Sequence, residues 1–203
     1  MNKKSVKVSV LLSLLSVTFC AMGAYAHPVP LKSHGFTEKE QVSADKAITF
    51  SRVQVRKLNA NLAKAYGAQA IFIPPAKHKR GASTLSRTRS RGEHVIRQLA
   101  AYEPLTSVCA VDSGDYYLMT ELSKETAKLL FKRGLATPEE AARWARRGGD
   151  EGFKRLGAVT RLNCVPVRAA FNASVPGFEN AYIVTRAALS EAPVPKKPCG
   201  CSN

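Results

Sequence analysis

The chain has 203 residues, and 31 lysines and arginines against 15 aspartates and glutamates give it a formal net charge of +16. This length leaves room for one domain with a well-formed core but not for two large domains. A hydrophobic content of 45% with 23% charged residues is normal for a globular protein, which excludes a wholly disordered or fibrous chain. No sequence pattern decides whether the protein is an enzyme.

The first 26 residues have the three-part order of a secretory signal peptide. Lys3, Lys4 and Lys7 form a basic start, an apolar run extends from Val8 to Met22, and Ala24-Tyr25-Ala26 is a small-x-small cleavage site. A membrane anchor is the alternative, but the apolar run is shorter than the ~20 residues that span a bilayer. We therefore expect cleavage near Ala26 and a secreted or periplasmic protein that is not an integral membrane protein.

Four cysteines remain after the signal segment, namely Cys109, Cys164, Cys199 and Cys201. An even number in an exported chain indicates disulfides, and spacing alone leaves three pairings open. Because Cys109 and Cys164 each lie in a strand-like run, we predict a bridge between them. For Cys199-Gly200-Cys201 a soft metal site or a redox pair is the alternative, but two thiolates are an incomplete zinc site, so structural disulfides are favoured.

The pattern of Pro, Gly and apolar residues divides the rest of the chain. An irregular N-terminal segment is predicted for 27–43, a folded domain for 44–192 and a tail containing Pro and Cys for 193–203. In the first half of the domain, apolar periodicity predicts a helix over 44–66, a strand from Gln69 to Ile73, a basic loop over 76–92 and a short helix from Glu93 to Tyr102.

Turn residues 112–115 separate two apolar runs and predict a β-hairpin made of Leu105–Val111 and Tyr116–Glu121. A helix capped by Ser123 is expected to follow. Thr137-Pro138-Glu139-Glu140 is a stronger helix start, because Thr caps, Pro takes the first position and Glu140 closes a capping box. Its helix is expected to end near Gly148-Gly149, with Trp144 in the core and an Arg stacked on its ring.

Two further apolar runs, Val159–Ala170 and Ala181–Leu189, are predicted to be strands, the first an edge or bulged strand because Pro166 interrupts it. The order of these elements predicts a single α+β domain with a mostly antiparallel sheet and helices packed on one face.

Charge segregation is the most informative feature. Between Asp45 and Glu93 there is no acidic residue, and the same interval holds eleven basic ones. This concentration of positive charge creates an electric field that raises the rate at which the protein encounters polyanions. In an extended chain Arg87, Arg89 and Arg91 would point the same way, about 7 Å apart. The predicted anion-binding residues are Lys77, Lys79, Arg80, Arg87, Arg89 and Arg91.

The predicted function is therefore that of a disulfide-stabilised basic binding or accessory protein. Its expected partner is an acidic protein, an envelope polymer or an anionic lipid surface. Nucleic acid is a further candidate, but residues 76–92 lack the aromatic side chains on which single-stranded bases stack. The alternative is a basic surface that only keeps the protein soluble.

A second function from a different class is a small secreted, metal-independent ribonuclease or phosphodiester hydrolase. His78, His94 and Glu93 supply side chains for acid–base catalysis, and nearby arginines could hold a phosphate. The spacing of these residues is not diagnostic. A copper site at the amine and imidazole of His27 with His34 is chemically reasonable, but the Pro-rich start does not preform it, so no metal ion or cofactor is expected.

Overall fold

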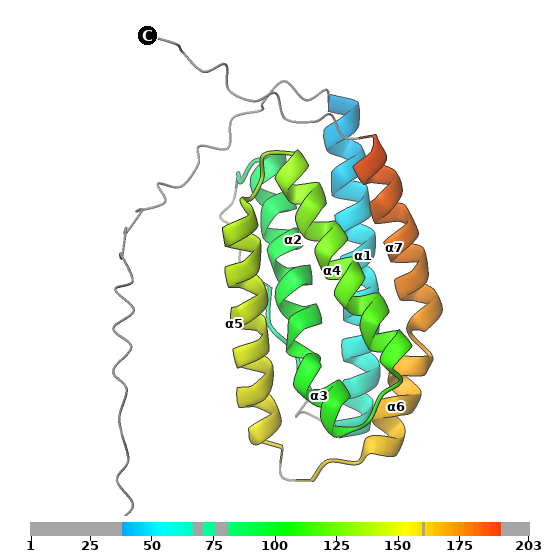
Figure 1. The fold of residues 1–203 in the computed structure, drawn as a ribbon. Coiled ribbons are helices and arrows are strands. Elements are labelled where there is room, and N and C mark those ends of the chain that lie inside the picture. The colour runs from blue at the N-terminus through cyan, green and yellow to red at the C-terminus, as the bar shows by residue number, and fades with distance from the viewer. Residues whose placement is uncertain (1–37, 67–70, 76–80, 160, 192–203) are drawn as a thin grey trace, which may run out of the picture. The chain divides into compact units, whose positions relative to one another are not determined.

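The computed structural model describes residues 38–66, 71–75, 81–159 and 161–191. These ranges form seven α-helices and contain no strand: α1 (Glu38–Tyr66), α2 (Thr84–Ala101), α3 (Glu103–Val108), α4 (Ser113–Lys132), α5 (Pro138–Gly157), α6 (Cys164–Asn172) and α7 (Val175–Ser190). The longer helices pack side by side, with α2 between α1, α4 and α5, and with α7 beside α1 and α4 (Figure 1). The predicted α+β fold with an antiparallel sheet is therefore wrong.

Several predictions fall on parts of the chain outside the described residues. These are the signal segment 1–26, the tail 193–203 with Cys199 and Cys201, and the residues His27, His34, Lys77, His78, Lys79 and Arg80. None of the described helices combines the length and the hydropathy that a membrane crossing requires.

Two helices stand where the hairpin was predicted. The residues between them do not form a hairpin turn, because the Asp112 carboxylate accepts a hydrogen bond from the Gly114 amide at 2.7 Å and caps α4. The buried residues of α4 continue at helical spacing well beyond the predicted hairpin, through Leu122, Thr126 and Leu129. This long 3.6-residue pattern outweighs the strand propensity of the two tyrosines at the start. The predicted cap Ser123 lies inside α4.

The two later predicted strands are α6 and α7. Their Val and Ile residues favour strands, but Pro166 and Pro176 each lie in a first helical turn, where the missing N–H has no acceptor to lose. Asn163 caps α6 by accepting a hydrogen bond from the Val165 amide at 3.1 Å. Proline in these positions starts helices instead of interrupting strands.

The helix predicted over 44–66 is confirmed within α1, but α1 begins at Glu38, so the prediction of an irregular segment is wrong for residues 38–43. The Thr137 capping box is confirmed at the start of α5. The Thr137 hydroxyl accepts from the Glu140 amide at 3.2 Å, and the Glu140 carboxylate accepts from the Thr137 amide at 3.0 Å. The predicted end at Gly148-Gly149 is wrong, since α5 continues to Gly157. Gly148 allows α5 to pack closely on its neighbour and does not end the helix.

Glycines bring α5 against the backbone of α2. A Cβ on Gly148 would overlap the carbonyl oxygen of Arg97, and a Cβ on Gly152 would overlap that of Ala101. Both contacts join residues 51 positions apart, as does the ion pair between Arg89 and Glu140. The two helices therefore run parallel in one register, and only glycine permits this approach.

We expect Gly152→Ala to lower the free energy of unfolding by about 1–3 kcal/mol, because the opposing atoms are backbone and cannot move aside. Gly149→Ala is the matched control in the same helix. A Cβ there meets no atom within 4 Å, so the better helix propensity of Ala should raise stability by roughly 0.5–1 kcal/mol. Chemical denaturation of both variants measures this, and equal effects would contradict the packing argument.

The predicted Cys109–Cys164 disulfide is present, with a Cα–Cα distance of 5.0 Å. It joins the end of α3 to the first residue of α6, not two strands. The guanidinium of Arg168 in α6 donates to the Cys109 carbonyl at 3.0 Å and reinforces the same junction.

Reduction, or Cys109→Ala with Cys164→Ala, should lower the free energy of unfolding by about 4 kcal/mol in the chain-entropy model. The reason is that the bridge closes a loop with a sequence separation of 55 residues. Denaturation with and without reductant tests this. An unchanged midpoint would show that the bridge does not restrict the unfolded chain.

Candidate anion-binding site

Residues 84–92 belong to α2, so the prediction of an extended basic loop is wrong there. Ser83 caps the helix by accepting a hydrogen bond from the Ser86 amide at 3.1 Å. Two residues along a helix turn a side chain by about 200°, so Arg87, Arg89 and Arg91 do not present one row of charges.

Two of these three arginines bind neighbouring helices. Arg89 pairs with Glu140 of α5 at 2.7 Å, and its guanidinium lies 5.4 Å from the ring centre of Trp144. Arg91 pairs with Asp45 of α1 at 2.8 Å. Trp144 is buried as predicted, and the arginine over its ring comes from α2. Arg89 and Arg91 therefore hold α2 to its neighbours, whereas Arg87 is exposed.

Another group of cations surrounds His94. Arg52 and Arg56 come from α1 and Arg97 comes from α2, and the charges of all three act on the imidazole. The Nε atoms of Arg52 and Arg97 are buried and have no hydrogen-bond partner among the residues that the structure describes. Both residues are partly exposed as a whole, so the outer N–H groups of each guanidinium, and not the buried Nε, can meet an added acceptor.

Residues 71–75 run beside this group without helical structure. Gln98 of α2 holds them, since its side-chain oxygen accepts from the Ile73 amide at 2.6 Å and its amide nitrogen donates to the Ile71 carbonyl at 2.8 Å. The Phe72 ring meets His94 edge to face, with the ring centroids 6.3 Å apart. Gln98 thus supplies the hydrogen bonds that a second strand would otherwise give to residues 71–73.

His94 is a buried neutral imidazole. The residue is 4% exposed, and neither ring nitrogen has a hydrogen-bond partner within the described part of the chain. Burial first, and then the charges of Arg52, Arg97 and Arg56, lower its pKa to about 4. The nuclease hypothesis needs this ring at the surface. The neighbouring Glu93 instead lies 3.7 Å from Arg97 as its ion-pair partner.

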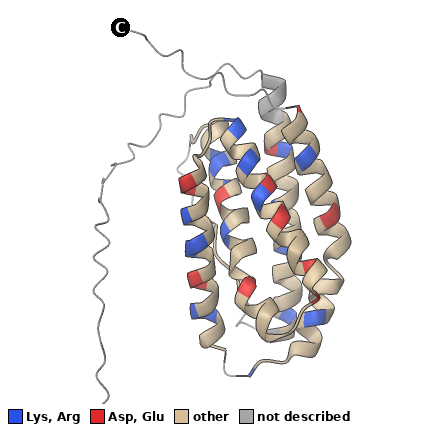
Figure 2. Ribbon diagram, viewed as in Figure 1, with Lys and Arg blue, Asp and Glu red and all other residues tan. Residues whose placement is uncertain are grey.

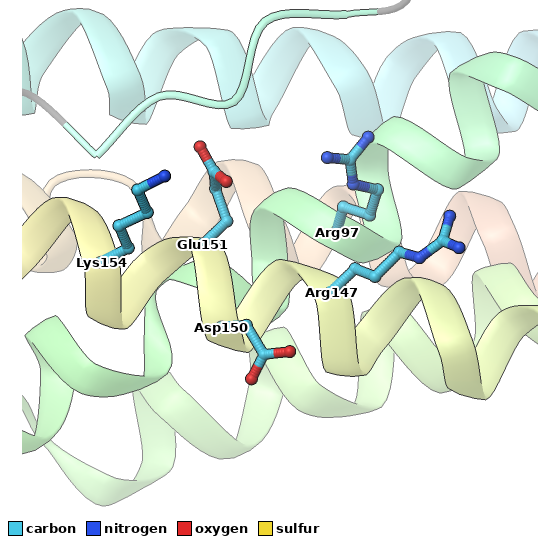
Figure 3. Close-up of a pocket in the computed structure, with 5 residues that line it drawn as sticks. All are labelled: Arg97, Arg147, Asp150, Glu151 and Lys154. Carbon is cyan, nitrogen blue, oxygen red and sulfur yellow. The ribbon is translucent and has the colours of Figure 1, made fainter.

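An open depression lies beside Arg97, between α2 and α5. It has a volume of about 310 Å³, and its lining comprises Arg97, Arg147, Asp150, Glu151 and Lys154. Figure 3 shows Arg97 and Arg147 extending from facing helices, while Lys154 and Glu151 point to the same side and Asp150 points away. Glu151 is already paired with Arg155 at 2.7 Å.

We call Arg52, Arg56, Arg97, Arg147 and Lys154 the basic cluster. Its members come from three helices. Arg97 lines the depression with Arg147 and Lys154, and it acts on His94 together with Arg52 and Arg56. Lys and Arg alternate with Asp and Glu along α5 (Figure 2), whereas α1 has no acidic residue after Asp45. The positive potential should therefore be strongest toward α1.

The sequence contained one signal for this cluster. Arg52 and Arg56 are four positions apart in a predicted helix and so share a face, but Arg97 could not be added without knowing that α1 and α2 pack side by side. Within the described ranges, no three His, Cys, Asp or Glu side chains gather as a metal site. Comparisons with known protein families, with curated proteins and with solved structures find no match.

The buried His94 should make stability depend on pH. Its pKa is about 4 in the folded chain against 6.5 in an exposed one, so the unfolded state binds more protons between these values. The free energy of unfolding should therefore fall as pH drops from about 6.5 to 4, by roughly 2–4 kcal/mol in total.

Denaturation at pH 5–7, above the usual carboxylate range, isolates this effect when His94→Gln is measured beside the parent protein. The slope should be much smaller in the variant, whatever its absolute stability. The same slope in both proteins would mean that His94 titrates normally.

Proposed function

We propose that the protein is a binding protein that docks an anionic, phosphate-bearing polymer on the basic cluster. The observation that carries this proposal is the open depression between α2 and α5 that Arg97, Arg147 and Lys154 line. Arg52 and Arg56 of α1 add positive charge beside it, since they act on His94 together with Arg97. A guanidinium matches the geometry of a phosphate and can donate two parallel hydrogen bonds to it.

Local geometry favours the cluster over the arginines already in short ion pairs. Arg89 and Arg91 lie 2.7 and 2.8 Å from their carboxylates. Arg97 lies 3.7 Å from Glu93, so it keeps donors for a ligand. Partial burial also strengthens attraction to an anion, because the effective dielectric is lower than in water.

A polymer fits better than a small anion, because the depression is open and the cations are spread over three helices. Lys77, Lys79 and Arg80 lie two to five positions after Pro75 in the sequence. Their contribution to the same ligand remains a prediction from sequence.

Arg52→Gln with Arg97→Gln should weaken binding of inorganic polyphosphate about tenfold or more, as two charge-assisted contacts are lost. Fluorescence anisotropy at several salt concentrations measures this, and affinity should fall as salt rises. The melting temperature should change little, since partly exposed charges contribute little to stability.

Arg161→Gln with Arg186→Gln is the matched control, because it removes the same charge from two exposed arginines outside the cluster. Equal losses in the two variants would mean that only net charge matters. Polyglutamate serves as a second probe, and equal affinity for both polymers would argue against recognition of phosphate.

A further inference from the structure

The outward side of α1 carries a stripe that the basic cluster does not use. Its members are all exposed, and they follow one another at intervals of three or four residues, apart from one interval of seven. They are Lys46, Phe50, Val53, Lys57 and Lys64. Phe50 is 37% exposed and Val53 is 39% exposed. Such spacing places these side chains along one face of the helix.

Helix α7 lies beside α1 and also has exposed apolar side chains. It runs antiparallel to α1, since the Ser51 and Thr185 hydroxyls lie 3.3 Å apart and the Ser43 hydroxyl donates to Glu191 at 3.2 Å. Val184, next to Thr185 in the chain, is 38% exposed, and Ile183 is 63% exposed. Four apolar side chains are therefore exposed along the neighbouring helices α1 and α7.

The charge around these apolar side chains favours a lipid over a protein partner. No carboxylate follows Asp45 in α1, and the acids of α7 are Glu179, one turn before Ile183, and Glu191, near its end. Lysine is depleted in the cores of protein–protein interfaces. A lysine-rich helix face with a few exposed apolar side chains instead has the composition of a surface that lies on an anionic membrane.

We propose that this stripe docks the protein on a membrane surface containing anionic phospholipids. Lys46, Lys57 and Lys64 would meet the headgroup phosphates, and their alkyl stems would lie along the apolar boundary. Phe50 and Val53 would enter the region between headgroups and acyl chains. The contact is peripheral, and it does not require the basic cluster to bind a polymer.

Sedimentation with vesicles tests the stripe. The full protein should bind vesicles of phosphatidylcholine mixed with phosphatidylglycerol and should not bind vesicles of phosphatidylcholine alone. Phe50→Ser with Val53→Ser leaves the charge unchanged and should weaken binding about tenfold. Lys46→Gln with Lys57→Gln should weaken it by a similar factor.

Each variant has a matched control elsewhere on the bundle. Phe153→Ser with Val165→Ser removes two exposed apolar side chains from α5 and α6, and Lys124→Gln with Lys128→Gln removes two exposed lysines from α4. Both controls should bind as the parent does. Losses equal to those of the stripe variants, or no binding to the anionic vesicles, would overturn the proposal.

Phe50→Trp gives a readout that does not depend on weakened folding. Its emission should shift to the blue with anionic vesicles, and that of Phe153→Trp should not. An unshifted Phe50→Trp overturns insertion even if sedimentation occurs. The double variant Arg52→Gln with Arg97→Gln should bind vesicles as the parent does, while its affinity for polyphosphate falls. A failure of the proposed polymer site and a failure of the stripe therefore give different results.

Discussion

The glycine contact between α2 and α5 sets the arrangement of the charged side chains. Gly148 and Gly152 let α5 lie directly on the α2 backbone, and this fixes which residues of the two helices are neighbours. The same register places Glu140 beside Arg89 near the start of both helices. It also places Arg97 beside the depression lined by α5 farther along. A side chain at either glycine would separate the helices and change all of these pairs together.

Burial and ion pairing, and not position in the sequence, determine which basic side chains are available to a ligand. Arg89 and Arg91 lie in the most basic stretch of the chain, yet each is held by a carboxylate from another helix. Arg52, in the same stretch, has no such short ion pair with any residue that the structure describes. Counting charges along the chain identifies a basic region. The availability of each charge depends on which acidic residue the tertiary structure brings to it.

The sequence predicted the helices with strong local signals, α1 by its long apolar period and α5 by its capping box. The sequence-based prediction failed for three helices that contain β-branched or aromatic residues. These are α6 and α7, each with a proline in its first turn, and α4, which a carboxylate caps. The disulfide pair was correct although the strands used to argue for it were not, because that argument needed only two cysteines in structured segments. The close approach of α2 to α5 could not be predicted from one sequence. The glycines near position 148 that allow it are equally typical of a helix end.

The neutral state of His94 is a consequence first of its burial and then of the cations Arg52, Arg97 and Arg56, which belong to the basic cluster. Protonation of His94 would add a fourth positive charge beside Arg52, Arg56 and Arg97. This charge would be buried and unpaired, which is energetically unfavourable. On the proposed function, an anion bound by these arginines would reduce the positive potential at the ring and weaken the depression of the His94 pKa. Linkage is reciprocal, so protonation of His94 would then favour the bound state. A single buried imidazole would thereby couple the charge of the cluster to its ligand, although His94 itself donates no hydrogen bond to any described residue.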